Sequence, residues 1–229
     1  MSAPEDDPLA ELAWPEPPAP GQQVSDAIRR HCTENLRPHR GLGRELRAGI
    51  SVAALGAVAL WLAAGMGTPH LARAALLGAF GWGLVALAVL FTGLARPPGR
   101  RIGRERRIAM AALLPLLFLA YLALSAEARL PLREFFDGPV ELAAACALNA
   151  LLAGAAATSA LLWLWRRTDP MSPAVSGALI GLIAGIAGAV GVGAGCAADE
   201  AWHLVAGHGL GVAVLALAGS FVGRRWLAP

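Results

Sequence analysis

The chain has 229 residues, of which 56% are apolar and only 15% are charged. Soluble domains usually carry about 25% charged residues, so this composition favours an integral membrane protein and argues against an ordinary water-soluble enzyme. All 19 basic residues are arginine, the formal net charge is +3, and the arginines are unevenly distributed along the chain. Their distribution determines the predicted topology below.

Residues 1–47 are polar, and their first part is rich in proline and acidic residues. Such a segment does not bury enough apolar surface to form a core, so we expect a partly disordered N-terminal tail. The start of the chain lacks the basic region, short apolar run and cleavage site of a signal peptide, which predicts that the tail is retained.

One short predicted helix in this tail carries a narrow apolar stripe. Its members step by four residues: Val24, Ile28, Cys32 and Leu36. A helix this short is only marginally stable in isolation, which favours docking of its apolar stripe into a groove on a partner protein. A helix lying on the lipid headgroups is the alternative interpretation. Nearby His31, Cys32 and His39 lack the second cysteine of a closed zinc site, so we expect no metal there.

Six apolar runs are long enough to cross the hydrocarbon core as helices, which takes roughly 17 to 25 residues. They are residues 48–67, 74–95, 108–126, 142–165, 175–195 and 204–223. None contains Asp, Glu or Arg, which argues against a conducting or proton-pumping role. The sequence therefore predicts an all-α, polytopic membrane bundle of six transmembrane helices over residues 48–223, with a short C-terminus at 224–229.

The arginines predict the orientation of this bundle. Sixteen lie in the tail, in the loops after the second and fourth spans, and at the C-terminus, whereas three lie in the other loops. Because cytoplasmic loops carry the excess of basic residues, we expect both termini in the cytoplasm of a bacterium and the protein in its inner membrane.

The fifth span has an unusual glycine pattern. Gly177, Gly181 and Gly185 repeat every fourth residue and therefore lie along one helix face. Small residues let a neighbouring backbone approach closely inside a membrane. Since the fourth span is rich in alanine, we expect the fourth and fifth spans to pack closely.

Four residues that can react with oxidants or bind soft metals lie at the predicted outer ends of the last three spans. They are Cys146, Cys196, His203 and His208. Thiols react with oxidants, and thiolate and imidazole bind soft metals, so these residues are the candidate sensing site. The alternative is that the cysteines serve as small apolar packing residues and the histidines are merely hydrated.

The features that combine in this part of the chain are six spans with both ends inside, Cys146 in the fourth span, Cys196 followed by His208, and a glycine-rich last helix ending in Arg224, Arg225 and Trp226. From about Arg44 to the end, this combination resembles the NrsF-type membrane anti-sigma factors. The resemblance implies that a short cytoplasmic N-terminal segment holds an extracytoplasmic-function sigma factor. It also implies that two outward-facing cysteines, here Cys146 and Cys196, sense oxidative or heavy-metal stress.

The sequence thus predicts a membrane anti-sigma factor that sequesters its sigma factor through residues 1–47 and releases it on an outer-face signal. The expected partners are the sigma factor and the lipid bilayer, with no direct nucleic-acid binding and no cofactor. The sequence shows no nucleophile with a base partner, no phosphate-binding loop and no paired carboxylates in the membrane, so we do not expect an enzyme. A small transporter or channel component without sigma binding is the alternative.

Overall fold

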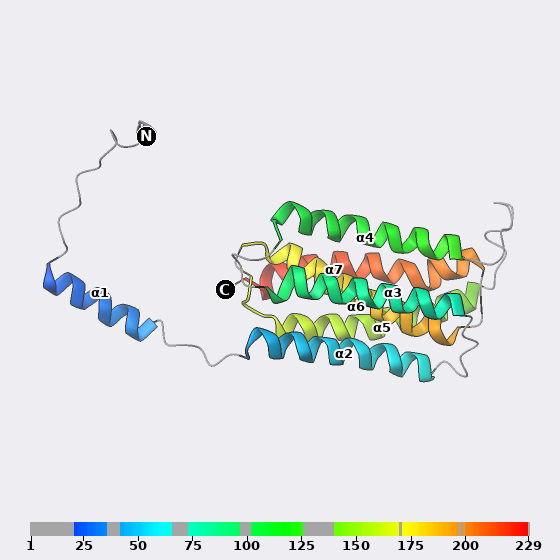
Figure 1. The fold of residues 1–229 in the computed structure, drawn as a ribbon, viewed down its shortest axis with the longest axis horizontal. Coiled ribbons are helices and arrows are strands. Elements are labelled where there is room, and N and C mark those ends of the chain that lie inside the picture. The colour runs from blue at the N-terminus through cyan, green and yellow to red at the C-terminus, as the bar shows by residue number, and fades with distance from the viewer. Residues whose placement is uncertain are drawn as a thin grey trace, which may run out of the picture. The chain divides into compact units, whose positions relative to one another are not determined.

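The computed structural model describes residues 21–35, 42–65, 73–96, 102–125, 140–169, 171–196, 198 and 200–228. Within these ranges the chain forms helices and connecting turns and no strand (Figure 1). Two compact units are distinguished, Met1–Gly41 and Leu42–Pro229. The first contributes the described helix α1 (Gln22–Asn35), and the second is a helical bundle.

Six helices of the bundle are long and apolar enough to cross a membrane. They are α2 (Arg44–Gly65), α3 (Arg73–Val89) continued by the π-helix η2 (Leu90–Ala95), α4 (Arg104–Ser125), α5 (Val140–Leu164), α6 (Pro173–Gly195), and the π-helix η5 (His203–Gly209) continued by α7 (Leu210–Trp226). The prediction of an all-α fold with six spans is confirmed. The helices of the first and third spans begin earlier than predicted, because their arginine-bearing flanks continue the helix instead of forming loops.

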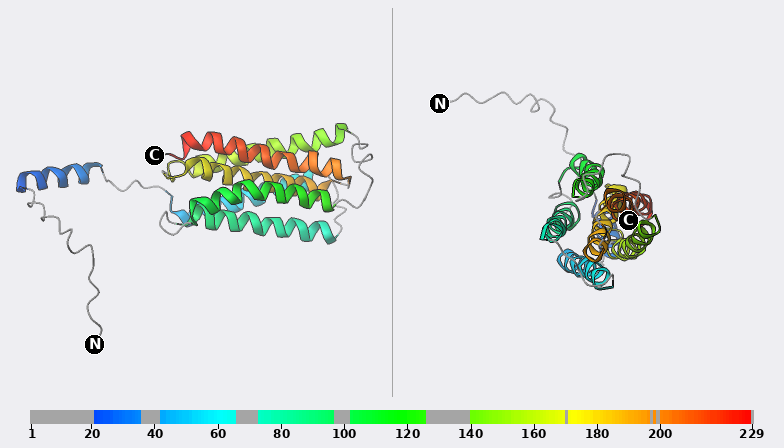
Figure 2. Two further views of the ribbon diagram at one scale, coloured as in Figure 1. Left: turned by 90° about the horizontal axis from the view of Figure 1, so that it is seen from above. Right: turned by 90° about the vertical axis from the view of Figure 1, so that its right-hand side faces the viewer.

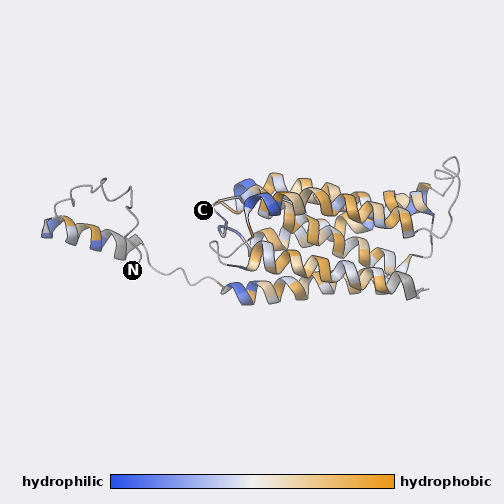
Figure 3. Cartoon of the chain, turned by 45° about the horizontal axis from the view of Figure 1, so that its top comes forward, coloured by the Kyte–Doolittle hydropathy of each residue, from blue (hydrophilic) through white to orange (hydrophobic). Residues whose placement is uncertain are grey.

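Helix α6 is the central helix of the bundle. It contacts each of the other five spans, and the end-on view in Figure 2 shows it surrounded by them. In the most apolar 18-residue stretch of α6, 83% of the residues are buried, whereas 17% are buried in the corresponding stretch of α4. The outer helices instead expose large apolar side chains such as Leu60, Phe80 and Leu217, so the hydrophobic colour in Figure 3 runs along the outside of the bundle. Apolar side chains on that surface suit contact with lipid.

Close packing of α6 against α7 depends on glycine. A Cβ atom added at Gly181 would overlap the carbonyl oxygen of Leu215, and one at Gly185 would lie 2.8 Å from the Cα atom of Val212. The ladder that we identified in the sequence therefore faces the sixth span. The close contact that we expected between the fourth and fifth spans is made largely by another residue, Gly188, where an added Cβ would lie 2.8 Å from the carbonyl oxygen of Ala150.

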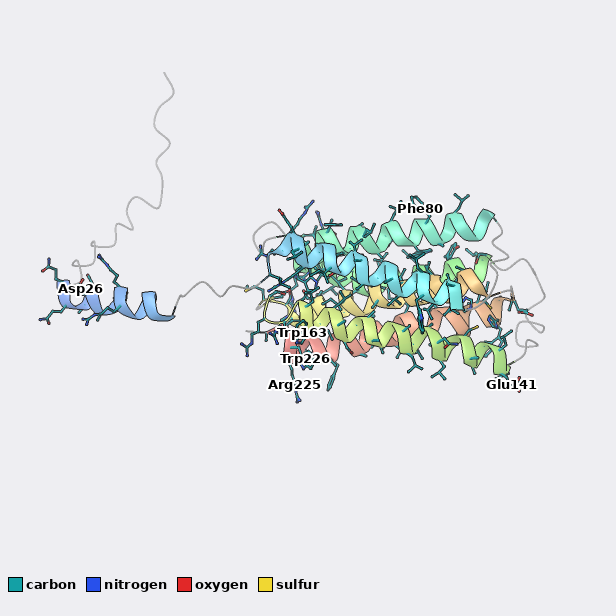
Figure 4. All side chains as sticks on the ribbon, turned by 90° about the horizontal axis from the view of Figure 1, so that it is seen from below. Asp26, Phe80, Glu141, Trp163, Arg225 and Trp226 are labelled. Carbon is teal, nitrogen blue, oxygen red and sulfur yellow. The ribbon has the colours of Figure 1, made fainter. Side chains whose placement is uncertain are left out.

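The up-and-down arrangement of the six spans brings their charged ends together. The arginines at one end of the bundle are Arg44, Arg47, Arg96, Arg104, Arg106, Arg107, Arg166, Arg167, Arg224 and Arg225. Figure 4 shows Trp163, Arg225 and Trp226 at this arginine-rich end and Glu141 at the opposite one. The opposite end also holds Cys196, and we refer to it as the cysteine end.

The packing predicts that Gly181→Ala destabilises the bundle, since the added methyl group collides with backbone that cannot rotate away. The expected loss is about 1–3 kcal/mol in the free energy of unfolding, measured by denaturant titration of the detergent-solubilised chain. Gly56→Ala is the matched control, because nothing lies within 4 Å of its added Cβ. Equal stability of the two variants would contradict this packing.

Candidate functional site

Cys146 lies in the second turn of α5 and is fully buried. Its neighbours in a small apolar cluster are Leu62 from α2, Ala150 from its own helix, and Val192 from α6. Gly207 of η5 also packs against this position, since a Cβ added there would lie 3.4 Å from the Cβ of Cys146. The thiol is therefore held where three spans and η5 meet.

Cys196 ends α6, where its backbone N–H donates to the carbonyl oxygen of Val192 at 3.0 Å. Its side chain is half-buried, and its Sγ lies 3.8 Å from that of Cys146. A disulfide requires about 2.05 Å between the sulfur atoms. The two residues are accordingly unbonded thiols in contact, brought together by the packing of α5 against α6.

The π-helix η5 contributes the two imidazoles. In an α-helix, residues five apart point about 140° away from each other, at 100° per residue. The i→i+5 hydrogen bonds of a π-helix return such residues to one face, as the bond from the Leu210 N–H to the Val205 carbonyl oxygen shows. His203 and His208 thereby lie with ring centroids 5.2 Å apart, and both are buried.

The two thiols and two imidazoles form one cluster. One nitrogen or sulfur atom from each of Cys146, Cys196, His203 and His208 lies within 4.8 Å of the others. Within the cluster, the Sγ of Cys196 lies 3.2 Å from the Nε2 of His203. Two sulfur and two nitrogen donors are a ligand set for a soft or borderline metal ion, and adjacent thiols also react with oxidants. All four residues singled out in the sequence are brought together here.

Asn149 lies three residues after Cys146 on α5 and does not join the cluster. Its side chain is exposed on the surface of α5.

A second polar cluster, which the sequence analysis missed, lies at the arginine-rich end. Arg107 and Asp169 form a buried ion pair with 2.9 Å between Nη2 and Oδ2. Arg107 also donates to the hydroxyl groups of Ser172, at 2.7 Å, and Ser176. The hydroxyl of Ser176 in turn donates to Asp169 at 2.5 Å. This network joins the start of α4 to the start of α6.

The sequence contains a faint signal for this ion pair. Arg107 is one arginine in a run of several, so nothing in its local pattern distinguishes it. Asp169 is the only acidic residue between the fourth and fifth spans, where it follows Arg166 and Arg167. A lone carboxylate in a basic loop can pair with either neighbour or with a distant arginine, and only the tertiary structure selects Arg107.

The loop between α5 and α6 also bonds to two further spans. Trp165 donates its Nε1–H to the hydroxyl of Ser51 on α2 at 3.0 Å. The backbone N–H of Arg167 donates to the carbonyl oxygen of Trp226 at 3.0 Å, and that of Asp169 to Leu227 at 3.2 Å. Arg167 adopts a positive φ of 57°, which is uncommon for a residue other than glycine and marks a tight turn. The loop that joins the two cysteine-bearing helices thus connects to α2, α4 and α7.

The residues predicted to bind a partner lie on or beyond α1. Val24 and Ile28 are in this helix and are 53% and 55% exposed. The backbone of Cys32 is helical, but its side chain lies outside what the structure describes, as does Leu36 altogether. The described part of the apolar stripe is therefore an exposed helix face.

Comparison with known protein families identifies a match over most of the chain. The profile of the NrsF family, described as negative regulator of sigma F, matches residues 33–228. The match includes both polar clusters and all six spans, and it begins after Val24 and Ile28. No curated protein and no solved structure matches the chain.

The buried ion pair predicts a large difference between two adjacent arginines. Arg107→Ala would leave the Asp169 carboxylate buried without its cation, at an expected cost of about 3–5 kcal/mol in unfolding free energy. Arg106→Ala is the control, because Arg106 is exposed and surface charges contribute at most about 1 kcal/mol. Denaturant titration of the full-length protein in detergent measures both. A loss for Arg107→Ala no larger than that for Arg106→Ala would contradict the buried pair.

Proposed function

Because this chain belongs to the NrsF family of negative regulators of sigma F, we propose that it is a membrane-bound anti-sigma factor for an extracytoplasmic-function sigma factor. The N-terminal segment sequesters the sigma factor, and an oxidative or heavy-metal signal at the opposite face of the membrane releases it. The family match over most of the chain carries this proposal, and the two polar clusters suggest how the signal is detected and transmitted.

The arginine-rich end is the cytoplasmic end in this proposal. Ten described arginines gather there, and the positive-inside rule places such an excess in the cytoplasm. Helix α2 begins at this end, so the N-terminal segment that precedes it is cytoplasmic as well. The cysteine end then lies on the outer, oxidising side of the inner membrane. Oxidants and metal ions that enter from outside reach thiols on that side before they reach the cytoplasm.

Helix α1 provides the proposed sigma-binding surface. Val24 and Ile28 expose apolar side chains on one face of a helix whose other described positions are mostly polar. Burying such a stripe in a groove of the sigma factor removes apolar area from water, and that gain offsets the cost of ordering a short helix. Cys32 and Leu36 continue the same stripe in the sequence and complete the proposed contact.

The four-residue cluster of Cys146, Cys196, His203 and His208 is the proposed trigger. An oxidant such as diamide takes two electrons and two protons from the thiols, which form one S–S bond while diamide becomes the corresponding hydrazine. The distance between the two sulfur atoms falls from 3.8 Å to about 2.05 Å, which draws the end of α6 toward α5. A soft metal ion bridging the thiolates acts on the same two helices.

The loop between α5 and α6 is the proposed route to the cytoplasmic side. The loop joins the last residue of α5 to the first residue of α6, and it bonds to Ser51 of α2 through Trp165 and to Arg107 of α4 through Asp169. Packed interfaces switch between discrete arrangements and do not deform continuously, so a small shift of α5 against α6 is able to break these bonds. Helix α2 leads directly back to the sigma-binding segment.

The orientation predicts which fusions to alkaline phosphatase are active, because the enzyme matures only outside the cytoplasm. Fusion after Ala198, at the cysteine end, should be active, and fusion after Arg167 inactive. Activities on plates and in lysates, normalised to fusion protein levels, check this. The reversed pattern would place the cluster in the cytoplasm and remove the proposed signal path.

The apolar stripe predicts that Ile28→Asp weakens capture of the sigma factor by the full-length, detergent-solubilised protein roughly 30-fold or more, as expected for a central contact worth at least about 2 kcal/mol. Gln23→Asp adds the same charge about 140° around α1 from Ile28 and should leave capture unchanged. Pull-down from a lysate with mass spectrometry identifies the partner, and titration gives the affinity. Equal affinity of the two variants would show that the stripe does not contact the sigma factor, and would favour the alternative in which α1 lies on the lipid headgroups.

The trigger predicts that a Cys146→Ser, Cys196→Ser double variant represses its sigma factor but no longer responds to diamide or cadmium. A sigma-dependent reporter in intact cells measures both properties. Ala145→Ser, which adds a hydroxyl group on the exposed face of α5, is the control and should respond like the wild type. A full response of the double variant to both agents would show that the cysteines only fill space.

A further inference from the structure

The two thiols and two imidazoles at the cysteine end carry an inference about the resting state of the protein. We propose that Cys146, Cys196, His203 and His208 are the four ligands of one zinc ion, held in a closed tetrahedral site before any stress occurs. The inference deepens the proposed sensor and rests on that function only for its consequence in signalling.

The distances within the cluster suit zinc. With Zn–S bonds of about 2.3 Å, two sulfur ligands of a tetrahedral ion lie about 3.8 Å apart, and the sulfur atoms of Cys146 and Cys196 are separated by 3.8 Å. A sulfur and a nitrogen ligand lie about 3.5 Å apart in such a site, close to the 3.2 Å between Cys196 Sγ and His203 Nε2. All four donor atoms fall within 4.8 Å, a span that fits a single ion.

The identity of the donors points to the same metal. Tetrahedral sites with two sulfur and two nitrogen ligands are typical of zinc, whereas magnesium and calcium take oxygen donors. Cys146, His203 and His208 are buried and only Cys196 is partly exposed. A site with four protein ligands and little access for water is structural in type and not catalytic.

An unsatisfied nitrogen atom supports a ligand at this position, because His208 Nε2 is buried without a hydrogen-bond partner among the described residues. His203 Nδ1 is also unpartnered there, but it lies on the side of the ring away from the Nε2 atom that approaches Cys196. Buried polar atoms are almost always paired, and an ion is one of the few explanations when they are not. Glu200, three residues before His203, likewise has a buried Oε2 atom with no partner in the described structure. A carboxylate is the usual acceptor for the second ring N–H of a zinc-bound histidine.

A bound zinc ion would connect three elements of the bundle. Cys146 belongs to α5, Cys196 ends α6, and both histidines lie in η5 at the start of the sixth span. The π-helix is explained by this role, because an α-helix would turn one histidine away from the ion. When diamide oxidises the two thiolates, it takes up their two electrons and two protons from water, one S–S bond forms, and the zinc loses two of its four ligands. In the signalling mechanism, zinc thus holds the two thiolates in place at rest, and formation of the S–S bond that expels the ion moves α6 against α5.

The test uses the full-length chain, purified in detergent under reducing conditions and exposed to excess zinc followed by removal of unbound metal. Mass spectrometry of the metal content should give about one zinc per chain for the wild type and for Cys32→Ser, and less than about a tenth for Cys146→Ser, Cys196→Ser. Cobalt(II) in place of zinc should give the intense visible bands of a tetrahedral site and a thiolate-to-cobalt charge-transfer band.

Absence of bound zinc and of the cobalt bands in the wild type would overturn the inference, as would equal zinc in the double variant. If the double variant fails to fold, the cobalt spectrum of the wild type still decides, because only thiolate ligands produce the charge-transfer band. Sigma-factor capture by the same preparations separates the two proposals. If the protein captures the sigma factor but binds no zinc, only the proposed metal site is refuted. If it binds zinc but captures no sigma factor, only the proposed anti-sigma function is refuted.

Discussion

Close contact between helix backbones around α6 is the constraint on which the rest of the structure depends. Gly181 meets the backbone of Leu215 on α7, and Gly188 approaches the Ala150 carbonyl on α5. In a membrane, where lipid is as apolar as the side chains, such contacts replace the hydrophobic effect as the source of helix association. They also leave little freedom for α6 to rotate or slide. Its two ends are consequently fixed against their neighbours.

Both polar clusters are products of that fixed position. One end of α6 brings Cys196 to Cys146, and the other brings Ser176 to Arg107. The buried ion pair at the arginine-rich end is costly to desolvate, and breaking it leaves an uncompensated buried charge. In the proposed mechanism, the bonds of this network share Arg107 and Asp169, so a shift of α6 weakens them together.

The sequence analysis recovered the fold well, because twenty-residue apolar runs and clustered arginines are strong signals in a membrane protein. It also identified all four residues of the cysteine-end cluster. It did not foresee why His203 and His208 share a face, since a π-helix replaces the expected α-helix there. It also missed the pairing of Arg107 with Asp169, which are 62 positions apart. Both depend on tertiary packing, which no local pattern records.

The central claim is that a change at the cysteine end alters the loop between α5 and α6 at the other end of the bundle. Hydrogen–deuterium exchange of the full-length protein in nanodiscs tests it directly at the amides of Arg167 and Asp169, which donate to the carbonyl oxygens of Trp226 and Leu227. Exchange at both amides should accelerate when diamide or cadmium is added, and stay slow in the variant with serine at positions 146 and 196. Unchanged exchange at these amides while the sigma factor is released would contradict the account.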